Sequence, residues 1–189
     1  MGNGHFMMRR AIFLDRDGVL NRALVRKGLP YPPRQLTELE ILPDVPQALV
    51  QLRALDFTLI VVTNQPDVAR GTVSRDAVAA INDRLKAVLP IDVILTCFHD
   101  EGDNCVCRKP KPGFMYQMRD ERGISLGHSY MIGDRWRDID AGLNAGCRTV
   151  FIDRGYAERW PLGAADHVCA SLGQAAHWIA SLPKPRGLE

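Results

Sequence analysis

The sequence lacks the features that would mark a membrane protein or a nucleic-acid-binding protein. It contains no apolar stretch long enough to span a bilayer, and it has no internal repeat or low-complexity segment. Lysine and arginine exceed aspartate and glutamate by only two residues, 24 against 22, so no strong basic field is present to attract nucleic acid. With 189 residues, 46% of them apolar, the chain can bury a proper core, and we expect one domain over residues 1–189.

Cysteine is also scarce, with five residues in the chain, three of which fall within eleven positions. Such clustering suggests a metal site in a reducing compartment rather than a disulfide framework, so we expect a cytoplasmic protein. The apolar stretch near the N-terminus is too short for the core of a signal peptide. We expect residues 1–8 to be a tag remnant or disordered, residues 183–189 to form a frayed tail, and the protein to be a monomer.

The first informative stretch is a short apolar run, Ala11 to Leu14, which is typical of a strand buried on both faces. It is followed by two carboxylates one residue apart, Asp15 and Asp17, and then by Gly18, which frees the backbone to turn. Two like charges at the end of a buried strand are costly unless a cation lies between them. A hard divalent ion, most simply Mg²⁺, would satisfy them, although a solvated turn is the simpler alternative.

Short apolar runs alternate with helical patterns along the rest of the chain, which predicts a parallel sheet covered on both faces. We expect strands at residues 11–14, 58–62, 91–95, 130–132, 149–152 and 165–168. We expect helices at residues 43–55, 74–89, 113–122, 139–145 and 172–182. Glycine and proline exclude a regular helix from residues 22–39, which we expect to be a loop over the two carboxylates.

Polar side chains follow three of the expected strands. Asp15 and Asp17 follow the first, Thr63 and Asn64 end the second, and Asp134 ends the fourth. In parallel α/β sheets, ligands bind outside the carboxyl ends of the strands. Each of these residues alone has an ordinary structural explanation, but their joint placement favours a binding site at this edge of the sheet.

The cysteine cluster lies in the loop at residues 97–107. Cys97, His99, Cys105 and Cys107 offer three thiolates and one imidazole, the kind of set that structural Zn²⁺ takes. Free thiols or a disulfide are the alternatives, although Cys105 and Cys107 are too close for an easy mutual bridge. Zinc would order a loop that has few apolar residues and would fix the two cations that follow it.

Four segments, taken together, resemble the motifs of the haloacid dehalogenase (HAD) superfamily of phosphatases. The matching segments, in order, are Asp15–Asn21, Val62–Gln65, Arg108–Pro110 and Gly133–Asp134. Within the superfamily the chain is most similar to the D-glycero-D-manno-heptose 1,7-bisphosphate 7-phosphatases and the related histidinol-phosphatases. This closer resemblance rests on three features. The first motif has the form Asp-Arg-Asp-Gly-x-x-Asn, Ala69–Gly71 follow Gln65, and the Cys/His loop is followed directly by Arg108.

The resemblance implies a three-layer α/β/α, Rossmann-like fold with a central parallel sheet, no large cap domain and a zinc-binding loop. It implies a Mg²⁺-dependent phosphomonoesterase that removes the 7-phosphate of heptose bisphosphate, a lipopolysaccharide precursor, through an aspartyl-phosphate. Asp15 would be the nucleophile, and Asp17 would protonate the leaving oxygen and then activate water. Asp15, Asp134 and the backbone carbonyl of Asp17 would bind Mg²⁺.

The resemblance also implies a set of residues that bind the phosphate and the rest of the substrate. They are Asn21, Thr63, Asn64, Gln65, Arg70, Arg108 and Lys109. Fixed cations and donors of this kind suit phosphoryl transfer, in which charge spreads over the equatorial oxygens.

The chain departs from the family pattern at two places beside the expected site, with Pro66-Asp67 where many relatives have Ser-Gly and Arg135 where many have Lys. These departures concern the substrate more than the chemistry. Histidinol phosphate and a nucleic-acid 3′-phosphate end are therefore alternative substrates, the second disfavoured by the near-neutral charge. A zinc-stabilised binding module without catalysis is the alternative from a different class of protein.

Overall fold

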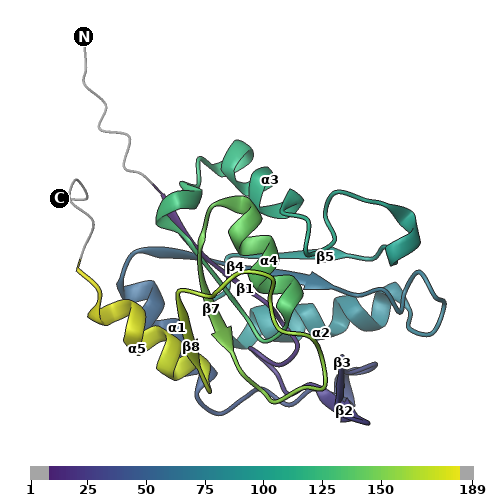
Figure 1. Cartoon of the computed structure of the whole chain (residues 1–189). Coiled ribbons are helices and arrows are strands. Elements are labelled where there is room, and N and C mark those ends of the chain that lie inside the picture. Colours follow the sequence, from purple (N-terminus) through teal and green to yellow (C-terminus); the bar gives the residue numbers. More distant parts are fainter. Residues whose placement is uncertain (1–8, 184–189) are drawn as a thin grey trace.

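Six apolar strands form the centre of the molecule. The computed structural model describes residues 9–183, so the expectations for residues 1–8 and for the tail beyond Pro183 lie outside the described residues. The strands are all parallel and are ordered β5-β4-β1-β6-β7-β8 (Figure 1). They are β1 (Arg10–Leu14), β4 (Phe57–Asn64), β5 (Val93–Cys97), β6 (Tyr130–Gly133), β7 (Arg148–Ile152) and β8 (His167–Cys169). The predicted parallel sheet is confirmed.

Five helices cover the sheet. They are α1 (Val45–Ala54), α2 (Arg75–Val88), α3 (Gly113–Arg122), α4 (Trp136–Ala145) and α5 (Leu172–Ser181), joined by three short 3₁₀ turns at Leu36–Glu38, Glu101–Asp103 and Leu126–His128. Their ends follow local sequence signals: Ser74 accepts a hydrogen bond from the Ala77 amide at the start of α2, and Gly146 ends α4 in the left-handed conformation. Within residues 9–183, no helix is both long and apolar enough to cross a bilayer.

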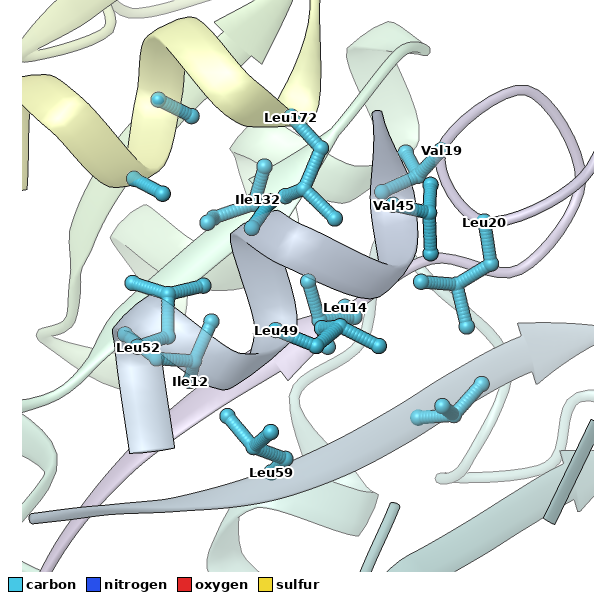
Figure 2. Close-up of a cluster of buried hydrophobic side chains, with 14 of the residues drawn as sticks. Ile12, Leu14, Val19, Leu20, Val45, Leu49, Leu52, Leu59, Ile132 and Leu172 are labelled. Carbon is cyan, nitrogen blue, oxygen red and sulfur yellow. The ribbon is translucent and has the colours of Figure 1, made fainter. Parts of the chain in front are cut away.

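Two buried clusters, one on each face of the sheet, make the fold a three-layer α/β/α sandwich. Successive residues of β1 alternate between them, because neighbouring side chains of a strand point to opposite faces. Figure 2 shows the first cluster, in which Leu49 and Leu52 of α1 and Leu172 of α5 pack over Ile12 and Leu14. Helix α2 contributes to the same cluster, whereas α3 and α4 supply the second.

The strand order places the site. From β1 the chain adds β4 and β5 on one side, and then crosses to add β6, β7 and β8 on the other. The order therefore reverses between β1 and β6, and ligands bind at such a switch point, beyond the carboxyl ends of the strands. The residues at these two ends are Asp15 and Asp134, and the Asp15 amide donates to the Ile132 carbonyl at 3.0 Å.

Residues 22–39 are not the unstructured loop that we predicted. They contain an antiparallel hairpin, β2 (Leu24–Arg26) and β3 (Leu29–Tyr31), and one of the 3₁₀ turns. Lys27 and Gly28 form its turn with φ of 51° and 77°, a conformation that suits two-residue hairpins. Proline in β3 hid this strand, because proline is usually confined to sheet edges. The hairpin is small, which agrees with the expected absence of a large cap.

The third predicted strand is displaced by two residues, to Val93–Cys97 instead of 91–95. Asp92 explains the shift. Its backbone amide donates to the Leu59 carbonyl and its carboxylate accepts from the Leu59 amide, so Asp92 is bound near the start of β4 before β5 begins.

Candidate active site

An open cleft of about 420 Å³ lies at the carboxyl ends of β1, β4 and β6. Its walls come from the strand ends, the hairpin, the segment that follows the cysteine loop, and the start of α4. The lining residues are Asp15, Asp17, Ala23, Pro30, Tyr31, Pro32, Asn64, Lys109, Arg135, Arg137 and Asp138.

Three buried aspartates gather beside this cleft, two of which, Asp15 and Asp138, line it. Asp15, Asp134 and Asp138 each offer a carboxylate oxygen, and these oxygens lie within 4.8 Å of one another. Burial, together with Asp138 and Asp17, raises the pKa of Asp15 to about 6, although Lys109 opposes the rise. Burial and the Asp15 and Asp138 carboxylates also raise the pKa of Asp134 well above its usual range. Such a cluster is costly unless cations compensate for it.

Lys109 is one compensating cation. Its ammonium nitrogen lies 2.7 Å from Asp15 Oδ1, 2.7 Å from Asp138 Oδ1 and 2.6 Å from the Val62 carbonyl oxygen. Burial alone would lower the pKa of Lys109, but the Asp138 and Asp15 carboxylates raise it above its usual value. Lys109 is therefore charged and fixed in place at the predicted nucleophile.

Asp134 and Asp138 differ in how their oxygens are used. Asp138 Oδ2 accepts from the Arg135 amide at 3.0 Å and Oδ1 faces Lys109, so both oxygens have partners. Neither buried carboxylate oxygen of Asp134 makes a hydrogen bond of good geometry among the described residues, although the nearby Tyr156 hydroxyl partly offsets the rise in the pKa of Asp134. A buried carboxylate with unused lone pairs suits a hard cation such as Mg²⁺. Asp15 would be the neighbouring ligand.

Gly18 is required where the chain passes this cluster. Its φ is +97°, and a Cβ atom at this position would lie 1.7 Å from Asp134 Oδ2. Glycine therefore gives both the backbone conformation and the space that Asp134 needs.

The Asp17 carboxylate lies apart from the three clustered aspartates. It accepts from Arg16 Nη2 at 3.0 Å, from Asn21 Nδ2 at 3.0 Å and from Gln65 Nε2 at 2.8 Å. Asp138, and not the Asp17 side chain, is thus the third carboxylate of the cluster. The backbone carbonyl of Asp17 as a metal ligand stays a prediction.

The polar residues at the end of β4 support the site in different ways. Thr63 Oγ1 accepts from Gln65 Nε2 at 2.8 Å, which links Thr63 to Asp17 through Gln65. Asn64 holds the backbone of Lys109 from both sides, accepting from its amide at 3.2 Å and donating to its carbonyl at 3.1 Å. Asn64 therefore connects the sheet to the segment that carries the buried lysine.

Arg70 and Arg108, both predicted to bind substrate, lie outside the lining of this cleft. Arg70 is half exposed and pairs with both carboxylate oxygens of Asp100 at 2.7 Å, which lowers the pKa of Asp100 to about 2. Arg108 lines an adjoining hollow, donates to the His99 carbonyl at 3.2 Å and has a buried Nε without a partner among residues 9–183.

The four residues of the cysteine loop come together as a compact cluster. The sulfur atoms of Cys97, Cys105 and Cys107 lie 3.4–3.7 Å apart, and His99 Nδ1 lies 3.6 Å from Cys97 Sγ and 3.4 Å from Cys107 Sγ. Tetrahedral zinc thiolates with bonds of 2.3 Å have sulfurs about 3.8 Å apart, so the cluster fits zinc closely. Burial, with the neighbouring thiols, raises the pKa of Cys107 to about 12.

Asp138 and Arg137 are site residues that our sequence reasoning missed. Both lie in the first turn of α4, which we predicted to begin only at residue 139. The missed signal is an acidic residue, Asp138, three positions after Arg135, which is the N-cap of α4. The Asp138 carboxylate accepts a hydrogen bond from the Arg135 amide, as an acidic residue at this position of a helix often does.

Comparison with known proteins agrees with the geometry of the site. A family model described as HAD-hydrolase-like matches residues 106–175. The D-glycero-beta-D-manno-heptose-1,7-bisphosphate 7-phosphatase of Pasteurella multocida (strain Pm70) is 35% identical over 160 residues, 78% of this chain and 84% of the relative. The enzyme of the same name from Escherichia coli (strain K12) is 32% identical over 189 residues, 93% of this chain and 96% of the relative.

A solved structure agrees as well. The crystal structure of D,D-heptose 1.7-bisphosphate phosphatase from B. bronchiseptica, complexed with magnesium and phosphate, superposes with a TM-score of 0.77 at 30% identity. The match covers 90% of this chain and 98% of that one. The chain is therefore a phosphatase of the HAD superfamily and belongs to the family of the D-glycero-D-manno-heptose 1,7-bisphosphate 7-phosphatases.

Proposed function

We propose that this phosphatase is Mg²⁺-dependent and removes the 7-phosphate of D-glycero-D-manno-heptose 1,7-bisphosphate through an aspartyl-phosphate on Asp15. The names of the relatives and the magnesium and phosphate bound to the B. bronchiseptica enzyme support this substrate and this metal. One observation carries the proposal. Asp15 lies at the switch point of the sheet, bound to a buried lysine and next to Asp134, whose carboxylate oxygens make no hydrogen bond of good geometry in the described chain.

In the proposed reaction, a carboxylate oxygen of Asp15 attacks phosphorus while the bond to the sugar oxygen breaks. Lys109 stabilises the charge on the transferred phosphoryl group from its position 2.7 Å from Asp15 Oδ1. Asp17 gives a proton to the leaving sugar oxygen, and its carboxylate then takes a proton from the water that attacks the aspartyl-phosphate. Asn21 and Gln65 orient the Asp17 carboxylate for both steps.

Asp15 and Asp134 would hold the metal, and Asp138 would position Lys109. This division follows from the hydrogen bonds, because both oxygens of Asp138 already have partners, whereas those of Asp134 make no hydrogen bond of good geometry within residues 9–183. When bound, Mg²⁺ supplies positive charge that neutralises the phosphoryl oxygens. The Cys/His cluster would hold a structural Zn²⁺ and so order the loop that leads into Lys109.

A phosphate-release assay on a substrate panel tests the proposal. The panel contains heptose 1,7-bisphosphate, histidinol phosphate and a 3′-phosphorylated oligonucleotide, each with Mg²⁺ and with a chelator. We expect the highest kcat/KM for the heptose bisphosphate and loss of activity without Mg²⁺. A higher kcat/KM for histidinol phosphate would overturn the substrate, and full activity in the chelator would overturn the role of the metal.

A further inference from the structure

A second, positively charged hollow adjoins the catalytic cleft. It measures about 410 Å³ and lies between the cysteine loop and the start of α4. Arg108, Lys111 and Arg137 contribute cations to its lining, while Asp100 and Glu101 contribute carboxylates. Lys109 and Arg137 line both this hollow and the catalytic cleft. A ligand bound at Asp15 can therefore extend from the cleft towards Arg137.

Arg137 is held in position before any ligand binds. Its guanidinium carbon lies 4.4 Å from the centre of the Trp136 ring, and its Nη2 lies 2.5 Å from Glu101 Oε1. The Arg137 side chain is only 23% exposed, whereas that of Glu101 is 63% exposed. Ion pairs with so exposed a partner contribute little to stability, so Glu101 can be exchanged for another anion at small cost.

Arg108 reinforces the positive charge beside Arg137. Its Nε is buried without a hydrogen-bond partner among the described residues, and one of its Nη atoms donates to the His99 carbonyl. Two neighbouring guanidinium groups with unused donors suit a dianion, because arginine binds phosphate through parallel hydrogen bonds.

We propose that Arg137 is a specificity-determining residue that binds the phosphate the enzyme does not hydrolyse, displacing Glu101 from the guanidinium. This inference rests on the proposed function, in which the substrate carries two phosphates. Asp15 and Arg137 line the same cleft, so a substrate whose one phosphate lies at Asp15 would present the other to Arg137. Arg137 thus favours a bisphosphate over the corresponding monophosphate.

The test compares heptose 1,7-bisphosphate with heptose 7-phosphate, since the two share the phosphate that is released. We expect R137Q to lower kcat/KM for the bisphosphate by about ten- to one-hundredfold and to leave the monophosphate within about twofold. E101Q should instead lower KM for the bisphosphate, because it frees Arg137. R119Q is the matched control: Arg119 also stacks on a ring, that of Tyr116, and pairs with a carboxylate, that of Asp120, but lies outside both hollows.

The outcomes separate this inference from the proposed function. An enzyme that hydrolyses neither compound overturns the proposed function, and the inference falls with it. If both are hydrolysed and R137Q changes neither, or changes both equally, the function stands and the inference is wrong. If E101Q weakens turnover of the bisphosphate as R137Q does, the ion pair merely holds the loop, which also overturns the inference.

Discussion

Gly18 shows at the residue scale how closely the backbone approaches the acidic cluster. We expect G18A to destabilise the protein and to abolish Mg²⁺ binding, because its Cβ would overlap Asp134 Oδ2. Gly71 is the matched control, since its φ is also positive, at +70°, but no atom lies within 4 Å of the Cβ position. G71A should cost only about 1–2 kcal/mol of backbone strain. The free energy of unfolding of both variants is measured in urea. Equal losses in G18A and G71A would contradict the proposed overlap between the new Cβ atom and Asp134.

The raised pKa of Asp15 predicts how pH affects stability. The pKa of Asp15 is about 6 in the folded protein, above the ordinary value of 3.8. As pH rises, the unfolded chain therefore loses this proton at a lower pH than the folded protein does. In the metal-free protein, the Asp15 contribution to the free energy of unfolding therefore falls as pH rises from about 4 to about 6. Mg²⁺ competes with the proton, so it should raise Tm more at about pH 8 than at about pH 5.

Thermal unfolding of the wild type and of D15N, with and without Mg²⁺ at both pH values, checks this prediction. The difference between the two proteins reports Asp15 together with Asp134 and Lys109, whose pKa values depend on it, and removes the effect of distant titrating groups. An increase in Tm on adding Mg²⁺ that is the same at both pH values in the wild type would contradict it.

The surroundings of several charged residues could not be predicted from the sequence, and they share a physical cause. The substrate-binding role of Arg70 stays a prediction; its partner Asp100 lies 30 positions further along the chain, and no local pattern predicts that pair. Arg137 and Asp138 resemble ordinary charges of a helix start until the fold brings Glu101 of the cysteine loop and Lys109, which follows that loop, against them. Asp15 and Asp134 could be placed because each directly follows a strand.

At the scale of elements, the cysteine loop connects metal binding to the site. We expect C107S to lose most of the bound zinc and to lower kcat/KM by about ten- to one-hundredfold, because Arg108 and Lys109 follow Cys107 directly. C169S is the control, since Cys169 lies outside the Cys/His cluster and its sulfur contacts the Ser171 carbonyl. Metal analysis of the purified variants decides the matter, and unchanged zinc content in C107S would contradict the proposed ligand set.

Elements with strong periodic patterns could be predicted, and those with weak ones could not. The apolar strands and the five helices were expected within a few residues, because buried faces impose the pattern. The hairpin at Leu24–Tyr31 was missed because its strands have three residues each and one contains Pro30. Its stability comes partly from elsewhere, as the Gly28 carbonyl accepts from the Ala157 amide at 2.8 Å.

At the scale of the whole molecule, the function depends on strand order. The sequence pattern predicted parallel strands, but whether β6 lies beside β1 or at an edge depends on packing over the entire sheet. Only the order β4-β1-β6 brings Thr63, Asp15 and Asp134 to adjacent strand ends. The resemblance to the HAD superfamily implied this arrangement, and the structure accounts for it physically.

The most direct test of the account is phosphate release with Mg²⁺ by three aspartate variants. D15N and D134N remove the proposed nucleophile and metal ligand, whereas D140N alters a buried α4 aspartate that pairs with Arg159 outside the cleft. We predict at least about a thousandfold lower kcat/KM for D15N and D134N, and a near wild-type value for D140N. Wild-type turnover in folded D15N or D134N would contradict the account.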